Sequence, residues 1–453
     1  MRTYQKIFFC FLGISFLFIL FIQNSFSKQI KDLKNSHIKQ DVKIYSLNWC
    51  IETALKRNLT LKEKRLSVLE IKRDVAIQFK KMLPTISTKY SYLGLKNVNV
   101  INIMGKDVAV SSHDNYDWQI VISQPIFEAG ALLNSYRAAK VTEKIARLEL
   151  ESVKNQIIRD VKVAYYNLLM AEKILNEQKS AVRRLRAHLA DAKALFEVGL
   201  LGKNDLLASK VSLSQAIQDE IKARHDVMLL KSKLNLLLRR NLVAPLYIKD
   251  KFILPKNILS FSIALSIAIR NRPELKAARL AIKKAEFLLD MARSNYLPHV
   301  NLNAIYDRKG ITPDLSDNPY GQHESEEVTV VATWNLWSWG ADRDKCKKAA
   351  YFLSQARIQY RLVHDNISIE VQKALLKLKE AINSYKVAKE SLRQAKENFD
   401  INQAKFKEKL VSNTDVLDAQ DLLVKARTRY FKALADISIA TSQLDYALGK
   451  AYQ

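Results

Sequence analysis

Apolar side chains recur along this chain with two different periods. In residues 46–81 they lie three or four positions apart, which is the spacing of an amphipathic helix. Pro84 follows this stretch, as is typical of a proline just beyond a helix end. From residue 85 the period changes to two, so that one face of the segment is apolar or aromatic and the other polar. The pattern predicts a helix that is followed directly by a strand.

The pattern continues in one order and then occurs again. The elements expected in the first half are strands at about 85–95 and 117–125, a helix at about 133–198 and a shorter helix at 205–239. Those expected in the second half are a helix from about 261, strands at about 299–307 and 327–335, and a helix at about 341–408. The strands have one apolar and one polar face, as those of a membrane barrel or of a half-covered soluble sheet do.

Matching residues in the two halves are separated by a constant number of sequence positions within each of two blocks. Leu83-Pro84 matches Leu297-Pro298, an offset of 214 positions, and Gly130 matches Gly340, an offset of 210. The offset of 210 then persists to Asp205 and Asp415 without an insertion or deletion. Only a rigid element of critical length resists length change in this way. The sequence therefore predicts an internal repeat.

Each half contains a helix that is too long for a globular core. Residues 133–198 contain neither proline nor glycine, and at 1.5 Å per residue they span about 100 Å. The two shorter helices of a half reach the same total length, so they match one long helix when stacked end to end. Coiled-coil packing is expected, with small residues that allow close approach at Ala164, Ala171, Ala374 and Ala381.

The N-terminus predicts export. Arg2 and Lys6 precede an apolar run over residues 7–22, and Ser25 and Ser27 supply the small residues of a cleavage site. An uncleaved membrane anchor is the alternative. The expected segments are a signal peptide at 1–27, an N-terminal segment at 28–45, a first repeat at 46–240, a linker at 241–258 and a second repeat at 259–450.

Composition and charge exclude several other classes. The net charge is +27, but lysine and arginine are spread along the chain among acidic residues, so no nucleic-acid partner is expected. Three cysteines are too few for a disulfide framework, and the seven histidines show no metal-ligand spacing. Neither a phosphate-binding loop nor a catalytic triad is found. We therefore expect no cofactor, no metal and no enzymatic activity.

Several short motifs, in order and duplicated, carry a resemblance to a known family. They are residues 54–58 and 268–275 before each Leu-Pro, the segment 123–127 ahead of Gly130, and the turn 196–200 followed by Asp205. Together they resemble the TolC family of outer-membrane efflux proteins over nearly the whole chain after the signal. The fold class implied is mainly α with a β-barrel part: a trimeric α-barrel tunnel with a shared 12-stranded transmembrane β-barrel.

The resemblance implies a passive export duct across the periplasm and outer membrane of a tripartite efflux or type I secretion system. The implied partners are two further copies in a homotrimer, outer-membrane lipid, a periplasmic adaptor protein and an inner-membrane pump of RND or ABC type. The residues alone fit this in one respect: four strands have open edges that cannot lie in lipid, so other subunits must close the sheet.

The resemblance also implies a pore constriction made of acidic residues. The matching positions are Asp205 in the first repeat and Asp415 and Asp418 in the second. Rings of carboxylates favour cations. An alternative role for Asp205 and Asp415 is to cap the returning helix, and both roles can hold. The family often has an aromatic residue and an arginine near this turn, and Phe406 and Val411 occupy those places here. Neither side chain has a phenol or a guanidinium group, so a phenolic or guanidinium latch is absent at these positions.

Adaptor docking is expected at the two turns between long and returning helices. The turn residues are Val198, Gly199 and Leu200 in the first repeat, and Lys409, Leu410 and Val411 in the second. Two alternatives to a channel remain at this point: a periplasmic coiled-coil adaptor, and an exported basic scaffold. The duplication argues against the adaptor, and the alternating strands argue against the scaffold. The exported substrate cannot be read from the chain.

Overall fold

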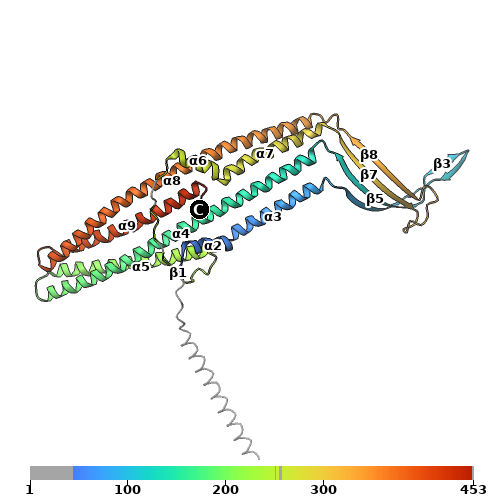
Figure 1. Ribbon diagram of the computed structural model, residues 1–453. Helices are drawn as coiled ribbons and strands as arrows, with labels where there is room; N and C mark the ends of the chain where they lie inside the picture. The colour runs from blue at the N-terminus through green and yellow to red at the C-terminus, as the bar shows by residue number, and fades with distance from the viewer. Residues whose placement is uncertain (1–43, 250, 255–257, 451–453) are drawn as a thin grey trace, which may run out of the picture.

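Eight helices of ten or more residues and one four-stranded sheet dominate the computed structural model, which describes residues 44–249, 251–254 and 258–450. The helices run side by side as an elongated bundle, and the sheet extends from one end of it (Figure 1). The predicted signal peptide and most of the predicted N-terminal segment lie outside the described residues. Among the residues described, no helix combines the length and the apolar character needed to cross a membrane.

The helices of the two repeats correspond one to one. Those of the first repeat are α2 (Leu47–Arg57), α3 (Leu59–Lys80), α4 (Ala131–Glu197) and α5 (Lys203–Leu237). Those of the second repeat are α6 (Phe261–Asn271), α7 (Pro273–Arg293), α8 (Ala341–Lys407) and α9 (Asn413–Ala447), with a 3-10 turn η1 (Ser294–Tyr296) after α7. Both α4 and α8 have 67 residues, and both α5 and α9 have 35.

The single first helix expected over 46–81 is wrong, because the chain breaks at Asn58 into α2 and α3. Asn58 has an extended ψ of 128°, so it cannot continue a helix. Its backbone N–H ends α2 on the carbonyl of Ala54, and its side chain accepts from the N–H of Leu61 to begin α3. One asparagine thus ends one helix and begins the next, and the periodic apolar pattern continues across it.

The sheet joins the two repeats in one layer. Its strands are β2 (Thr85–Gly94), β5 (Asp114–Phe127), β7 (His299–Gly310) and β8 (Glu324–Thr333), all antiparallel and in that order. Within the described residues β2 and β8 each have an edge without a partner strand, and no closed barrel forms. A separate hairpin of β3 (Val100–Ile103) and β4 (Lys106–Ala109) rises from the loop between β2 and β5, and β1 (Ile44–Tyr45) pairs with β6 (Tyr247–Ile248).

The helices extend the strand order into the bundle. Next to the sheet the packing order is α3, α4, α7, α8, which matches β2, β5, β7, β8. Farther from the sheet α5 replaces α3 beside α4, and α9 lies between α4 and α8. The described chain is therefore a wall one layer thick, with α3 and α5 along one edge and α8 along the other.

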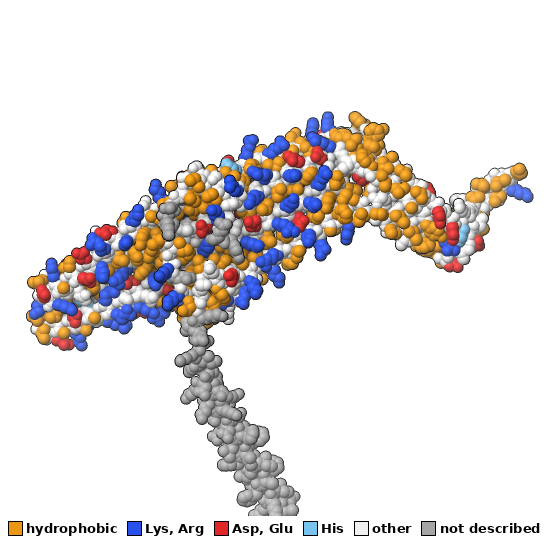
Figure 2. All heavy atoms as spheres, viewed as in Figure 1, with side chains coloured by type: hydrophobic (Ala, Val, Ile, Leu, Met, Phe, Trp, Pro, Cys, Tyr) orange, Lys and Arg blue, Asp and Glu red, His pale blue; other side chains and the backbone are white. Residues whose placement is uncertain are grey.

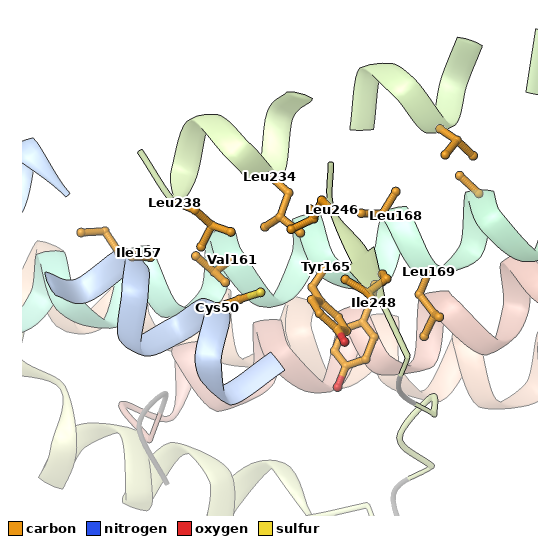
Figure 3. Packing of buried hydrophobic residues seen from close by; sticks show 14 of the residues in the cluster. Cys50, Ile157, Val161, Tyr165, Leu168, Leu169, Leu234, Leu238, Leu246 and Ile248 are labelled. Atoms are coloured by element: carbon orange, nitrogen blue, oxygen red, sulfur yellow. The ribbon is translucent and has the colours of Figure 1, made fainter. Parts of the chain in front are cut away.

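The largest apolar cluster lies halfway along α4, where the short elements pack on it (Figure 3). Tyr165 and Val161 of α4 are fully buried there with Cys50 of α2 and Leu234 of α5. Alanine is buried between the helices both in this cluster and in the second repeat: Ala171, Ala374 and Ala381 are all at most 7% exposed. Small buried side chains of this kind allow neighbouring helices to approach closely.

Candidate gate and docking tip

Both turns between a long helix and its returning helix lie at the end of the bundle opposite the sheet, which we call the tip (Figure 1). They share one backbone geometry. Gly199 (φ 75°) and Lys409 (φ 61°) are both left-handed. The next N–H reaches back in each case, from Leu200 to Leu195 at 2.8 Å and from Leu410 to Lys405 at 2.9 Å. This arrangement satisfies the last carbonyls of a helix.

The two turns differ in chemistry. The first presents exposed apolar side chains, Val198 at 66% and Leu200 at 56%, beside Gly199. The second presents Leu410 at 67% exposure beside the exposed Lys409, while Val411 packs partly on the core cluster of α8 and α9. The tip therefore offers an apolar turn and a basic turn.

Asp415, the third residue of α9, forms a reciprocal cap with the N-cap residue Ser412. Its Oδ2 accepts the backbone N–H of Ser412 at 2.9 Å and the Ser412 hydroxyl at 2.7 Å, while the Ser412 Oγ lies 3.2 Å from the N–H of Asp415. These donors hold the pKa of the Asp415 carboxyl below its usual value, because they favour the charged form. The capping role is present at Asp415, whose side chain is also exposed.

Asp205 and Asp418 are placed differently. Asp205 lies in the first turn of α5, but the N-cap there is Gly202, which makes no side-chain cap bond. The backbone carbonyl of Asp205 instead accepts from the side chain of Asn413 in α9 at 3.0 Å. Asp418 is exposed on α9, three positions after Asp415, so the two carboxylates share a helix face.

At Phe406, one of the two positions where a latch residue was considered, the structure has an apolar contact. Phe406 is 6% exposed in a cluster with Phe399, Val416 and Leu423, and its ring lies 5.0 Å from that of His188 in α4. The structure therefore seats Phe406 between the two hairpins without a polar bond of its own.

Sequence reasoning missed a line of polar residues on the face that α9 turns to α4. Asn413, Gln420 and Arg427 stand seven positions apart and alternate with the buried apolar Val416 and Leu423. Polar side chains at one position of successive heptads were the available signal. On α4, Asn413 contacts His188, Gln420 accepts from Arg184, and Arg427 donates to Glu177. Among the residues described, no group of three or more His, Cys, Asp and Glu side chains could hold a metal ion.

A duplicated wall with a strand layer at one end and paired helical hairpins at the other is the architecture of an outer-membrane channel subunit. The outer membrane efflux protein family model matches residues 50–238 and 264–450, and the chain belongs to that family. The family comprises outer-membrane transport channels with a large periplasmic part, which decides the location and argues against an adaptor, a scaffold or an enzyme.

Two relatives are similar in sequence. The alkaline protease secretion protein AprF of Pseudomonas aeruginosa is 23% identical over 354 residues, covering 74% of this chain and 70% of the relative. The outer membrane protein TolC of Escherichia coli is 21% identical over 347 residues, covering 72% and 68%.

Solved structures share the fold. The Campylobacter jejuni CmeC outer membrane channel superposes with a TM-score of 0.78 at 19% identity, covering 90% of this chain and 86% of CmeC. VceC of Vibrio cholerae gives a TM-score of 0.77 at 14% identity, covering 89% and 96%. The helix-rich wall and its sheet thus have the architecture of outer-membrane channels.

Proposed function

We propose that three copies of this chain form a passive export duct of a tripartite efflux or type I secretion system, with an acidic gate at the tip. The observation that carries the proposal is the joint between the two repeats inside the chain, which the proposal repeats between the free edges of neighbouring copies. An adaptor protein would dock at the tip, and an RND or ABC pump in the inner membrane would supply the energy.

The joint between the repeats provides a template for the joint between copies. Strand β5 pairs with β7, and α4 packs on α7, so the end of the first repeat meets the start of the second. The second repeat ends in β8 and α8, and the next copy begins with β2 and α3. The same joint made between chains therefore adds copies head to tail, and such contacts close into a ring when the rotation permits.

Matching residues pair in the same way in both repeats, so the strand register expected between two chains can be derived residue by residue. Thr88 pairs with Ile120 in the first repeat, and the matching Leu302 pairs with Val330 in the second. Within the chain, Ile120 of β5 also pairs with Tyr306 of β7. Adding the repeat offset of 210 to Ile120 gives Val330, and subtracting the offset of 214 from Tyr306 gives Tyr92. The same pairing between chains therefore predicts that Val330 of one copy lies opposite Tyr92 of the next.

The wall edges carry exposed apolar side chains that solvent does not favour. On α8, Tyr351 is 69% exposed and Ile369 70%; on α3, Leu66 is 57% exposed and Leu69 55%. Contiguous apolar surface of this kind marks a contact with protein or membrane. Pairing α8 with α3 of another copy buries both rows.

The sheet has the two faces of a membrane barrel. Ile86 and Val328 are each 74% exposed on one face, whereas Lys89 and Gln119 lie on the other. Trp337 and Trp339, 72% and 90% exposed, follow β8 where the sheet meets the helices. Figure 2 shows hydrophobic side chains over this region and charged ones over the helices. Aromatic side chains at such a boundary are typical of a membrane interface.

At the tip, three copies bring Asp415 and Asp418 around one axis, with Asp205 nearby on the first hairpin. Six second-repeat carboxylates at one constriction favour cations and bind multivalent ones. Exposed Val198, Leu200 and Leu410, with Gly199, Lys409 and Val411, form the expected adaptor surface.

A cross-linking experiment tests the assembly. Tyr92→Cys and Val330→Cys are introduced together into a chain in which Cys50 is replaced by Ala and Cys346 by Ser. Oxidation of outer-membrane fractions should give covalent dimers and trimers on denaturing gels. The control pairs Tyr92→Cys with Val331→Cys, which points to the opposite face and should stay monomeric. Recovery of the parent chain as a soluble monomer would overturn the proposal.

A further inference from the structure

Each repeat has a hollow where its first short helix ends and the next helix begins. The hollow of the first repeat lies beside α2, α3 and α4 and has a volume of about 720 Å³. The hollow of the second repeat lies beside α6 and α7 and has a volume of about 420 Å³. Three pairs of lining residues match at the repeat offset of 214: Leu55 with Ile269, Lys56 with Arg270, and Arg65 with Arg279. The hollow is therefore a property of the repeat rather than of one surface loop.

Both hollows combine positive charge with apolar surface. In the first, the cations outnumber the two carboxylates of Glu52 and Glu151; they are Lys56, Arg65, Arg147 and Lys154. The described residues that line the second include no acidic side chain, and their cations are Arg270, Lys276 and Arg279. Leu55 and Ile269 supply apolar surface at the same place in each. Such a lining favours a ligand that carries negative charge on a partly apolar body.

The arginine that the two hollows share is held by a neutral acceptor in each. Arg65 donates to the backbone carbonyl of Leu55 at 3.5 Å, and Arg279 donates to the hydroxyl of Tyr360 at 3.3 Å. A neutral acceptor does not compensate the charge and takes only part of the donors of a guanidinium group. The remaining donors form a planar fork that matches a carboxylate. Each hollow can therefore receive at least one carboxylate.

The first hollow also has a buried amide in its lining. Asn155 of α4 is 8% exposed, and within the part of the chain that the structure describes its side chain has no hydrogen-bond partner. A buried amide without a partner is costly unless a ligand or water satisfies it. A side-chain amide can pair with a peptide group, because each has both a donor and an acceptor. An amide beside a guanidinium group is suited to a short peptide that carries a carboxylate.

The hollows lie outside the sheet and far from the tip. At 1.5 Å per residue, Arg147 and Asn155 are roughly 25–35 Å from the start of α4 and about 65 Å or more from its end at the tip. The short helices α2 and α6 pack on α4 and α8 as an added layer. That layer would fill the bore if it lay inside the proposed duct, so it belongs on the outer side. Three copies then place six hollows at one height around the tube.

We propose that these hollows bind carboxylate-bearing peptides of the cell wall and so tether the duct where it crosses that layer. The inference rests on the proposed function, because it needs three copies that span the periplasm. The cell wall is a thin layer of glycan strands that are cross-linked by short peptides with free carboxylates. A tube that crosses such a layer meets it all round at one height, as the six hollows require. An acidic helix of the adaptor is a less suitable occupant, because the expected docking turns are at the tip.

The test measures how much purified trimer, in mild detergent, sediments with isolated cell-wall sacculi. The double variant Arg65→Gln, Arg279→Gln removes one cation from every hollow. The matched control is Lys389→Gln, Lys396→Gln, which removes two charges from exposed positions of α8 outside both linings. A second comparison uses sacculi whose carboxylates have been converted to amides, so that the ligand changes and the protein does not. The conductance of every trimer is recorded in planar bilayers.

We expect the parent and the control to bind sacculi alike, and the hollow variant to bind about tenfold less, because it loses charged hydrogen bonds. The parent should bind amidated sacculi as weakly as the variant binds native ones. Equal binding by the variant and the parent, or unchanged binding of the parent to amidated sacculi, would overturn the tether. A parent that does not sediment with sacculi, while the hollow variant exports poorly in cells, would overturn it in favour of a protein occupant.

The conductance separates this inference from the function on which it rests. All trimers should conduct as the parent does, because the hollows lie outside the bore. A parent trimer that conducts nothing would overturn the proposed duct, whatever its binding to sacculi. If the hollow variant does not assemble, the comparison of native with amidated sacculi decides the matter with the parent alone.

Discussion

The carboxylate of Asp415 and the N-cap Ser412 hold each other at the start of α9, with Asp415 Oδ2 2.7 Å from the Ser412 hydroxyl. Asp418 lies one turn farther and takes no part in this cap. The sequence allows both a capping role and a pore role at Asp415, and the structure shows that Asp415 and Asp418 differ in the first of them. Asp415 serves the helix start, whereas Asp418 is available for a pore role alone.

Substitutions at these positions should separate capping from pore charge. Asp418→Ala should reduce the cation preference of the channel and weaken block by multivalent cations, with thermal stability unchanged. Ser412→Ala removes an N-cap and should cost about 1 kcal/mol while leaving the ion selectivity of the parent. Reversal potentials in a salt gradient and thermal unfolding measure the two effects. A parent-like reversal potential in Asp418→Ala and in the Asp415→Ala, Asp418→Ala double variant would show that the carboxylates do not line the constriction.

The cap should also respond to acid in a defined window. Hydrogen bonds from Ser412 lower the pKa of Asp415 from 3.8, so the folded state binds the proton less readily than the unfolded one. The contribution of this carboxylate to stability is then present above pH 3.8 and is lost only as the pH falls below it. NMR titration should show the Asp415 pKa moving back toward its usual value in Ser412→Ala. An unchanged midpoint would mean that other groups set the pKa.

Each turn at the tip has one residue with a left-handed backbone, and substitutions of these two residues should change the thermal stability in opposite directions. Lys409 has φ 61° where the first repeat has Gly199. A non-glycine residue in this region costs roughly 1 kcal/mol, so Lys409→Gly should raise the thermal stability of the trimer by about that amount. Gly199→Ala should lower it, and only through the backbone, because no atom lies within 4 Å of the added Cβ. Equal melting temperatures for all three chains would contradict this reading.

The basic turn also makes Lys409→Gly informative about docking. If the second turn recognises an adaptor through the lysine side chain, the variant should be more stable yet export less in cells that carry the whole system. Lys405→Gly is not a suitable control because it lies inside α8. Lys396→Ala, on α8 and farther from the turn, removes one positive charge without altering the turn backbone.

The order of helices and strands was predictable from the sequence because matching residues of the two repeats keep a constant offset. Matching residues such as Gly130 and Gly340 both have φ above 80° at the start of a long helix, and a fixed offset reports such shared geometry directly. The break at Asn58 was missed because the apolar pattern runs on through α2 and α3. The available signal was Pro273, which stands at the first position of α7 in the second repeat.

The β3–β4 hairpin and the seam of polar residues on α9 were missed for different reasons. The hairpin turns at Met104 and Gly105 with φ of 52° and 84°, which is turn chemistry in a short alternating segment that looks like a polar loop. The seam was missed because the heptad spacing of Asn413 and Arg427 does not identify their partners, which lie on α4, more than two hundred positions away in the sequence.

The length of α4 should be far less tolerant than the length of the hairpin. Removing residues 171–174 shifts everything beyond by about 6 Å and turns it by about 40°. Glu177, Arg184 and His188 would then miss their partners on α9, and the first turn would fall short of the second. We expect this deletion to abolish trimer formation, as measured by gel mobility in mild detergent.

Removing the hairpin provides the matched test. Asn99 and Val110 already lie within hydrogen-bond distance, since the Val110 N–H reaches the Asn99 carbonyl at 2.8 Å. Deleting residues 100–109 therefore joins two ends that are already close, and β2 keeps its register with β5. Trimers should form and conduct as the parent does. Equal assembly after both deletions would show that helix length does not constrain this protein, and the constant offset of the repeats would need another cause.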